Sequence, residues 1–394
     1  MDLRDALAAR IDRRRGDLVA LSHAVHTDAE IAYEEHASSR RVSSALEAGG
    51  FAVETGVCDL PTAFVATAGT GPLHLGICAE YDALPGIGHA CGHNIIAAAA
   101  VGAGLALAEI ADDLGITVSV LGTPAEEGGG GKILMLERGG FDGLNAAMMV
   151  HPAPLESSTF PCLAVQHLEV TYRGRSAHAS AYPQLGINAA DAFTVAQVAL
   201  GLLRQHIHPT DRIHGIITHG GDAPNIVPEL TTGRWSIRAS TLAELEILMP
   251  KVERCFEAGA IATGCDVTVD RSRPPYSEFQ PDPDMVSLYE GEATAIGRSF
   301  DPVDAVSELS GSTDMANVSL AMPTIHPMLR IEAGGAVNHQ PGFTAACITA
   351  DADRAVRDGA LAMARTVVAI TESPAVRDRL LATSYRADPS TSLA

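Results

Sequence analysis

The chain has 394 residues, more than the roughly 250–300 at which a single hydrophobic core usually stops growing, so more than one domain is expected. Its 48 Asp and Glu outnumber its 27 Lys and Arg, which gives a formal charge of −21 and argues against nucleic acid or an anionic membrane as a partner. With 46% hydrophobic and 19% charged residues, the composition is that of a globular protein and not of a disordered one.

The cysteines and the N-terminus predict a cytoplasmic location. The seven cysteines are odd in number and scattered, unlike a disulfide framework. Residues 1–21 are charged throughout and lack the apolar core of a secretory signal. The longest apolar stretch, 95–107, is rich in Ala and Gly and shorter than the about 20 residues that cross a bilayer.

The first part of the chain alternates between helix and strand patterns. In chain order we predict helix over 3–48 with a break near 27–31, strand 73–79, helix 95–110, strand 116–121, helix 132–138 and strand 146–150. This alternation predicts βαβ units in an α/β domain with a mixed, mostly parallel sheet. Ligands of such sheets gather beyond the carboxyl ends of the strands.

A different pattern follows, with polar and apolar residues alternating over 165–174. The predicted elements are strand 165–174, helix 186–205, strands 212–219 and 229–240, helix 241–263 and strand 266–270. This β-α-β-β-α-β order is that of a ferredoxin-like domain. Helix 284–297, strand 324–329 and helix 348–371 then resume the first pattern. We therefore predict a discontinuous domain of residues 1–163 plus 275–394, interrupted by a smaller domain of residues 164–274.

Several potential metal ligands follow predicted strands: Cys91 and His93 in HACGH, Glu126 and Glu127, His151, and, far downstream, His339. In an extended segment, residues two apart such as Cys91 and His93 point to one side. Thiolate, imidazole and carboxylate groups bind Zn and Mn-like cations. A further carboxylate beside the ligands can serve as a base, as metal-assisted hydrolysis requires.

Each of these residues also has a purely structural explanation. Cys91 could be an inert core thiol, His151 could cap a strand, and residues 126–127 could form a solvated loop. Their coincidence in one alternating pattern makes a metal site as credible as the structural explanations.

The sequence argues against three other kinds of functional site. A phosphate-binding loop over 126–133 would need Gly at position 126 and Ser or Thr at position 133, where the chain has Glu and Ile. The chain lacks the G-x-S-x-G pattern of serine hydrolases. Gly102-Ala103-Gly104 lies inside a predicted helix, where close packing is its expected purpose and not dinucleotide binding.

Seven segments occur in an order that resembles peptidase family M20: AEYDALPGIGHACGHN (79–94), GTPAEEGGGGK (122–132), HPAP (151–154), GRSAHASAYPQLGINAADA (174–192), GGDAPNIVPE (220–229), GSTDMANVS (311–319) and NHQPGFTAA (338–346). The resemblance is to its dinuclear metal amidohydrolases with a Cys-Gly-His motif. This branch includes auxin-conjugate and hippurate-type amidohydrolases, p-aminobenzoyl-glutamate hydrolase and dipeptidase-like members. Segment 79–94 is most similar to the last two.

The resemblance implies two divalent cations per subunit, Mn or Zn and alternatively Co or Ni. Their ligands would be Cys91, His93, Glu127, His151 and His339. Glu126 would be the general base, and Asp82 would orient the site without binding metal. Elsewhere in the wider family a metal-binding His occupies the position of Glu80, so a contribution of Glu80 stays open.

The resemblance also implies that the inserted domain acts as a lid and a dimerisation surface. His178 would be a catalytic residue that reaches the partner's active site in a homodimer and stabilises the tetrahedral oxyanion. Asn225 and Arg238 would hold the substrate's carboxylate or carbonyl. From the residues alone, Arg238 could lie on a solvated strand face, and Asn225 could be a turn residue beside Gly220-Gly221.

The expected function is metal-dependent hydrolysis of the amide bond in a small N-acyl or N-aroyl amino acid or a dipeptide, by water that the metal activates and Glu126 deprotonates. Two alternatives remain. One is hydrolytic deamination, or another unusual C–N cleavage, on the same dinuclear site. The other is a non-catalytic, ligand-binding homologue of this fold.

Overall fold

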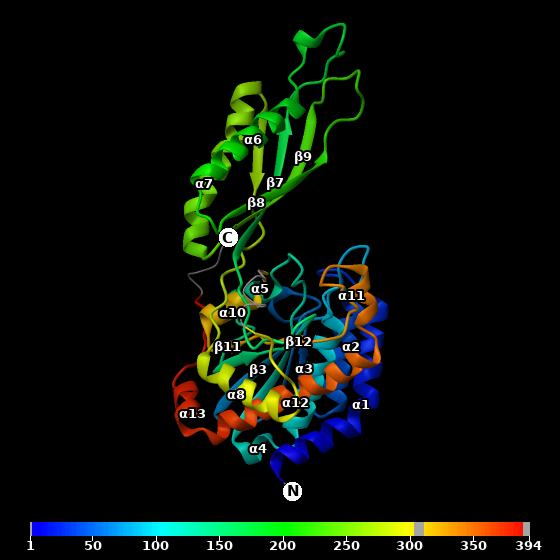
Figure 1. The fold of residues 1–394 in the computed structure, drawn as a ribbon, viewed down its shortest axis with the longest axis vertical. Helices are drawn as coiled ribbons and strands as arrows, with labels where there is room; N and C mark the ends of the chain where they lie inside the picture. The colour runs from blue at the N-terminus through cyan, green and yellow to red at the C-terminus, as the bar shows by residue number, and fades with distance from the viewer. Residues whose placement is uncertain (1, 303–310, 389–394) are drawn as a thin grey trace. The chain divides into compact units, whose positions relative to one another are not determined.

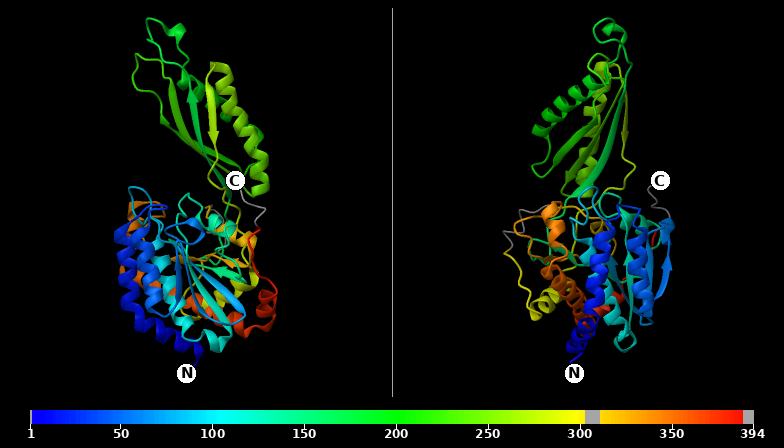
Figure 2. Two further views of the ribbon diagram at one scale, coloured as in Figure 1. Left: turned by 180° about the vertical axis from the view of Figure 1, so that it is seen from behind. Right: turned by 90° about the vertical axis from the view of Figure 1, so that its right-hand side faces the viewer.

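The computed structural model describes residues 2–302 and 311–388. The chain divides into two compact units, traced in Figures 1 and 2. Unit 1 consists of Met1–Pro161 and Phe279–Ala394, and unit 2 of Cys162–Glu278. Over the described residues, none of the helices combines the length and the apolar character needed to cross a membrane.

Unit 1 is built on a mixed six-stranded sheet. Its order is β1 (Ala52–Thr55), β2 (Phe64–Gly69), β4 (Ile116–Gly122), β3 (Leu73–Ala79), β5 (Ala146–Met148) and β11 (Thr324–Ile325). The pairs β4–β3, β3–β5 and β5–β11 are parallel, which confirms the predicted mostly parallel sheet. The antiparallel pairs β1–β2 and β2–β4 lie at one edge, and the sequence pattern did not predict β1 or β2.

Helices cover both faces of this sheet. On one face lie α1 (Leu3–Asp28), α2 (His36–Ala48), α3 (His93–Ala108) and α12 (Ala350–Glu372). On the other lie α5 (Gly131–Glu137) and α10 (Met315–Ala321). The pleat of β3 shows the division, because Leu75 and Ile77 belong to the first core and Cys78 to the second. The remaining helices of unit 1 among the described residues are α4 (Ala111–Leu114), α8 (Pro283–Ala295), α11 (Pro341–Ala346) and α13 (Pro374–Leu381).

Helix α3 is buried on nearly all sides, between the sheet and helices α1 and α12. A Cβ atom on Gly104 would lie 2.5 Å from Cγ2 of Val120, and one on Gly102 would lie 2.9 Å from Cβ of Ala360. The predicted close packing at these two glycines is therefore confirmed.

Predicted strand 146–150 ends early, at Met148, and predicted strand 324–329 is divided in two. Two residues after β5 the chain forms β6 (His151–Ala153), and two residues after β11 it forms β12 (Met328–Arg330). β6 and β12 pair in parallel as a separate two-stranded sheet. Pro327 lacks an N–H and interrupts the second strand, and its carbonyl accepts the N–H of His151 at 2.9 Å. His151 therefore begins β6, whereas the sequence pattern placed it directly after strand 146–150.

Unit 2 has a four-stranded antiparallel sheet in the order β10 (Asp266–Asp270), β7 (Ala164–Arg173), β9 (Leu230–Ala239) and β8 (Arg212–His219). Helices α6 (Ala189–Leu203) and α7 (Leu242–Thr263) pack on one face around Phe193 and Trp235. Thr241 caps α7 by accepting the N–H of Glu244, and Gly264 ends the helix in the left-handed conformation at φ 75°. The element order is β-α-β-β-α-β, and the face opposite the helices carries polar and charged side chains.

Candidate metal centre

The candidate ligands of unit 1 lie beyond the carboxyl ends of its parallel strands. Cys91 and His93 follow β3, and Glu126 and Glu127 follow β4. The expectation of an extended segment at Cys91 and His93 is wrong, because Gly92 is left-handed at φ 79° and His93 begins α3. A Cβ on Gly92 would lie 2.8 Å from Cγ of Pro152, so the residue must be small as well as left-handed.

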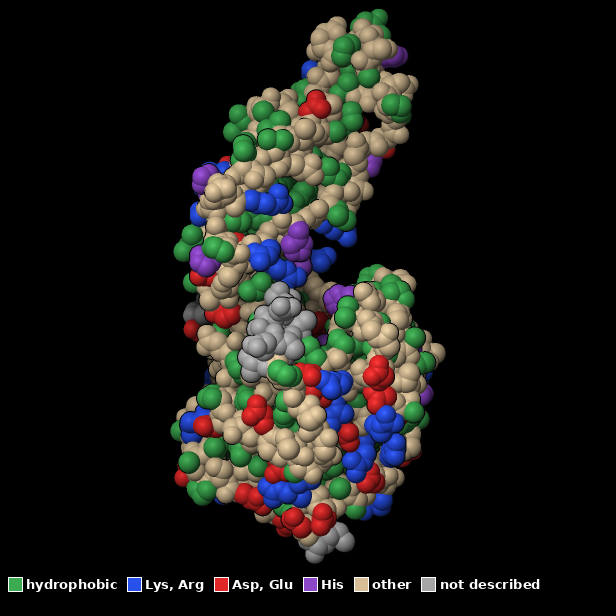
Figure 3. All heavy atoms as spheres, viewed as in Figure 1, with side chains coloured by type: hydrophobic (Ala, Val, Ile, Leu, Met, Phe, Trp, Pro, Cys, Tyr) green, Lys and Arg blue, Asp and Glu red, His purple; other side chains and the backbone are tan. Residues whose placement is uncertain are grey.

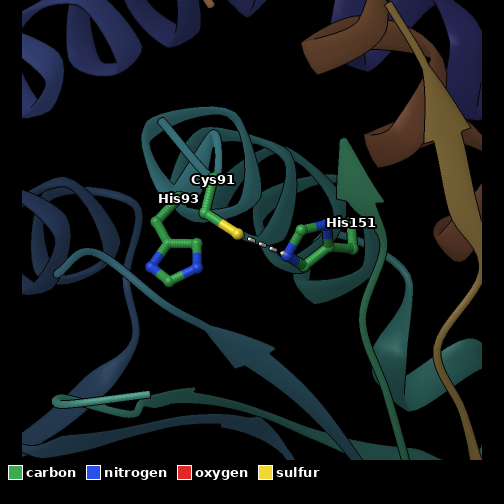
Figure 4. Close-up of side chains that lie close together, drawn as sticks. All are labelled: Cys91, His93 and His151. Carbon is green, nitrogen blue, oxygen red and sulfur yellow. Dashed lines mark hydrogen bonds between the residues drawn. The ribbon is translucent and has the colours of Figure 1, made fainter. Parts of the chain in front are cut away.

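The structure brings all five predicted ligands together. Sγ of Cys91 lies 3.4 Å from Nε2 of His151 and 3.6 Å from Nε2 of His339. Oε1 of Glu127 lies 3.5 Å from Nε2 of His339 and 4.0 Å from Nε2 of His93. Figure 4 shows the thiol of Cys91 between the imidazoles of His93 and His151, directed at the latter. Cys91 belongs to two potential metal-binding groups, one with His93 and His151 and one with Glu127 and His339.

Asp82 connects two of the candidate ligands. Its Oδ1 lies 2.9 Å from Nδ1 of His93, and its Oδ2 accepts the backbone N–H of Glu127 at 2.9 Å. This arrangement makes Nδ1 of His93 the donor to Asp82 and turns Nε2 toward the cluster. His151 is held in the same way, because its Nδ1 lies 2.9 Å from the carbonyl oxygen of Pro152.

The donor atoms fit divalent cations. Nε2 of His93 and Oε1 of Glu127 are buried without a hydrogen-bond partner, which is rare for buried polar atoms and typical of ligands. Ligand atoms about 2.0–2.3 Å from a tetrahedral cation lie about 3.3–3.8 Å from one another. The separations of 3.4, 3.6 and 3.5 Å around Cys91 and His339 match this spacing.

Burial sets the protonation of the cluster. It lowers the pKa of His151 to about 4, which leaves a neutral imidazole that can bind a cation. Burial, and next the charge of Glu127, raises the pKa of the Cys91 thiol well above its usual range. A cation bound at this thiol would favour the thiolate.

The two adjacent carboxyl groups differ in protonation. Burial, followed by the charges of Glu80 and Glu127, raises the pKa of Glu126 well above its usual range. Burial also acts to raise the pKa of Glu127, but His339 and then His93 outweigh it and lower that pKa. Oε2 of Glu126 lies 4.0 Å from Nε2 of His93, beside the candidate ligands. Glu126 is therefore suited to carry a proton, and Glu127 to stay ionised.

Of the three predicted substrate residues, all in unit 2, two lie together. The N–H of Ala179 donates to the carbonyl oxygen of Asn225 at 3.0 Å, and His178 pairs with Ile226. His178 and Asn225 are both exposed and lie just before the start of β9.

Arg238 lies near the opposite end of β9, on the face of the sheet without helices, where its Nε is 3.4 Å from Nε2 of His214. From Leu230 to Arg238 an extended strand covers about 26 Å. Lys, Arg and His side chains gather at one end of this unit in Figure 3. His178 and Arg238 of one copy are thus too far apart to touch one small substrate.

Sequence reasoning missed three buried residues beside the cluster: Lys132, Asp314 and His326. The ring of His326 packs edge-on against His151, with centroids 5.3 Å apart. Lys132 was noticed only within the rejected phosphate loop, although its place at the start of an apolar helix was a usable signal. Asp314 and His326 carried no signal in their spacing.

The profile of Peptidase family M20/M25/M40 matches residues 76–366. The chain belongs to this family. It is 40% identical over 390 residues to the Xaa-Arg dipeptidase of Mus musculus, an alignment that covers 95% of this chain and 90% of the relative. It is 33% identical over 256 residues to one of the subunits of p-aminobenzoyl-glutamate hydrolase from Escherichia coli K12, covering 59% of this chain and 53% of that relative.

Solved M20 structures share the fold. A dinuclear metal binding peptidase of the M20 family from Bacillus subtilis superimposes with a TM-score of 0.68 at 19% identity, covering 92% of this chain and 99% of that one. The predicted family is confirmed, and so is the predicted enzyme class. This M20 protein is therefore a hydrolase of C–N bonds.

Proposed function

We propose that the protein is a metal-dependent dipeptidase or amidohydrolase in which Glu126 is the general base. The observation that supports it is the convergence of a thiol, three imidazoles and a carboxyl group, with Glu126 beside them. The proposed ligands of two cations are Cys91, His93, Glu127, His151 and His339, with Cys91 shared. This donor set suits Zn or Mn, and Co or Ni as substitutes.

When bound, the cations would polarise the scissile carbonyl group and make an attacking water more acidic. Glu126 takes a proton from that water as the water oxygen bonds to the carbonyl carbon. The same carboxyl group then gives the proton to the leaving nitrogen as the C–N bond breaks. Asp82 keeps His93 oriented throughout.

The substrate class we favour is a dipeptide with a basic C-terminal residue. The relative named Xaa-Arg dipeptidase aligns with 95% of the chain, whereas the relative from p-aminobenzoyl-glutamate hydrolase aligns with 59%. The charge of −21 also favours the approach of a cationic substrate. Arg238 is proposed to bind the substrate's carboxylate, whose two oxygens suit a guanidinium group.

We further propose that unit 2 is the lid and dimerisation domain, and that His178 acts in the partner's site. The N–H of Ala181 donates to Nδ1 of His178 at 3.1 Å, so Nε2 carries the proton and can donate it to a developing oxyanion. The separation of His178 from Arg238 within one copy favours two copies sharing each site. The edge strand β8 exposes the apolar side chains of Ile216 and Ile217, and a second copy that covered this edge would bury them.

A cytoplasmic location fits the thiols. None of the seven cysteines, all of which lie in the described part of the chain, forms a disulfide bond, and all of them except Cys58 are buried. Free thiols persist in reducing compartments, whereas disulfides accumulate in oxidising ones. We therefore propose that the protein works in the cytoplasm.

The decisive experiment is Glu126→Gln. Loss of the proton acceptor should lower kcat by about 100-fold or more while elemental analysis still finds the wild-type metal content. The exposed Glu47→Gln variant is the matched control and should keep wild-type turnover. Turnover of Glu126→Gln at the wild-type rate would refute the assignment of the base.

A substrate panel tests the reaction class. Alanyl-arginine, alanyl-glutamate, N-acetyl amino acids and aminobenzoyl-glutamate are compared with the metal-loaded protein. We expect the fastest amine release from alanyl-arginine. Ammonia release would favour deamination instead, and a protein that binds ligands without any turnover would favour the non-catalytic homologue.

A further inference from the structure

Three charged side chains form a fully buried cluster next to the proposed metal centre. Nζ of Lys132 lies 2.5 Å from Oε1 of Glu80 and 2.7 Å from Oδ1 of Asp314. The backbone N–H of Lys132 also donates to Oδ2 of Asp314 at 2.9 Å. Glu80 follows β3, Lys132 lies in the first turn of α5, and Asp314 immediately precedes α10. The cluster therefore joins three separate segments of unit 1.

The two acidic members of this cluster are bound differently. Both oxygens of Asp314 accept hydrogen bonds from Lys132. Of Glu80, only Oε1 is engaged by Lys132, and Oε2 has no hydrogen-bond partner. That oxygen lies 3.4 Å from Nε2 of His93, which is also buried without a hydrogen-bond partner. Two fully buried atoms that can bind a cation, Oε2 of Glu80 and Nε2 of His93, therefore face each other without hydrogen-bond partners.

This separation is what a shared cation would require. An oxygen and a nitrogen that each bind one tetrahedral ion at about 2.0–2.2 Å lie about 3.4 Å apart. Nδ1 of His93 is already turned to Asp82, so Nε2 is the ring atom available on the side of Glu80. A fixed carboxylate oxygen in this place would add a donor beyond the Cys-Gly-His ligand set.

We propose that Glu80 contributes Oε2 to the cation held by His93, and that Lys132 is the positioning residue that aims this oxygen. The proposal rests on the proposed metal-dependent function. Nζ of Lys132 donates a hydrogen bond to Oε1 of Glu80 and another to Asp314, which holds the ammonium group in place. Oε2 of Glu80 is therefore kept pointing at His93. The rival explanation is a purely structural ion cluster, with Glu80 paired to a protonated His93.

Cobalt titration of the metal-free protein distinguishes cation binding by Glu80 from a purely structural ion cluster. The visible absorption of bound Co²⁺ reports the atoms around each ion, and calorimetry gives its affinity. In Glu80→Gln we expect one of the two Co²⁺ sites to weaken by about 10- to 100-fold, with a changed spectrum. The matched control is Glu292→Gln, which also removes a buried carboxyl group of unit 1 but lies outside this cluster, where Arg4 and Arg365 bind it. It should keep the wild-type spectrum.

Wild-type affinity and spectrum in Glu80→Gln would overturn the role of Glu80, and so would equal changes in both variants. A wild-type protein that binds no Co²⁺ would instead contradict the proposed function itself. If Glu80→Gln does not fold, Glu80→Asp keeps the charge and shortens the side chain. Its spectrum should also change, and an unchanged one would overturn the proposal.

The positioning role of Lys132 has its own readout. Lys132→Met leaves Glu80 free to turn and should alter the Co²⁺ spectrum as Glu80→Gln does. Lys132→Arg keeps the positive charge and should restore part of the wild-type spectrum. Circular dichroism checks that each variant is folded. An unaltered spectrum in folded Lys132→Met would overturn this role.

Discussion

At the scale of single residues, Glu126 and Glu127 show how environment separates two chemically identical neighbours. Glu127 lies beside the imidazoles of His93 and His339, which lower its pKa. Glu126 is buried among carboxylates, and its pKa is raised. Adjacent carboxyl groups with opposite shifts are suited to different tasks, one binding a cation and the other moving a proton.

Cys91 is the residue whose loss should cost the most metal. It belongs to two potential binding groups, whereas His339 belongs to one. We expect elemental analysis of purified Cys91→Ala to show loss of both cations, and His339→Ala to retain about one. Cys255→Ala removes a buried cysteine of unit 2 and should keep the wild-type content. Full metal content in Cys91→Ala would contradict the shared-ligand assignment.

His167 should make stability depend on pH. Burial, followed by the charges of Arg238 and Arg273, lowers its pKa to about 4. Below about pH 6.5 the imidazole of residue 167 takes up a proton in the unfolded chain but stays neutral in the folded chain, which favours unfolding. The stability that the neutral imidazole contributes is therefore complete above pH 6.5 and is lost as the pH falls toward 4. Between pH 6.5 and 5.5 the loss should be at most about 1 kcal/mol.

Thermal unfolding at several pH values checks this prediction. His167→Gln should flatten the decline in unfolding temperature between pH 6.5 and 5.5. The exposed His206→Gln variant in the same unit should follow the wild-type curve. An undiminished decline in His167→Gln would show that other groups cause it.

At the scale of elements, the packing of α3 fixes where the loop with the proposed ligands Cys91 and His93 lies. This helix begins at His93 and is buried against the sheet, α1 and α12. Its small residues let it approach β4 closely, with Gly104 directly over Val120. Because His93 is the first residue of α3, the position of the helix also sets the position of this proposed ligand.

Gly104→Ala should therefore destabilise the protein. The added Cβ would lie 2.5 Å from Cγ2 of Val120, a side chain on a buried strand that has little room to shift. We expect a loss of about 1–3 kcal/mol in the free energy of unfolding, measured by urea denaturation. Gly201→Ala, in open space within α6, should instead add about 0.5–1 kcal/mol. Equal effects of the two substitutions would contradict the close packing.

At the scale of the whole molecule, the proposed substrate contacts of unit 2 could come from one copy or from two. Within unit 2, His178 precedes β9 and Arg238 lies near its far end. A dipeptide is too short to reach both in one copy. A symmetric dimer in which each site combines residues of two copies would remove this difficulty.

Mixing two inactive variants tests the shared site. Glu126→Gln and His178→Ala should each be nearly inactive alone. If His178 acts in the partner's site, a mixed dimer holds one intact site, and random exchange of subunits should restore up to about a quarter of wild-type activity. Light scattering must show dimers in each sample. If dimers exchange and no activity returns, His178 acts in its own copy or not at all.

The sequence predicted the elements whose pattern is local. Strands 73–79, 212–219 and 266–270 coincide with β3, β8 and β10, because an apolar run or alternation bounded by turn residues specifies them. The antiparallel strands β1 and β2, at one end of the sheet, were missed, since partner strands stabilise them more than their own residues do. The turn at Gly92 was also missed, because a left-handed glycine leaves no periodic signal.

The sequence by itself determined the alternation of strands and helices, and it determined that a thiol, imidazoles and paired carboxyl groups follow the strands. Only the tertiary structure decided that Cys91, His151 and His339 meet within 3.6 Å, and that Lys132 leaves one oxygen of Glu80 facing His93. The physical reason is that periodicity follows from neighbours along the chain, whereas a buried charge finds its partner through the packing of distant segments.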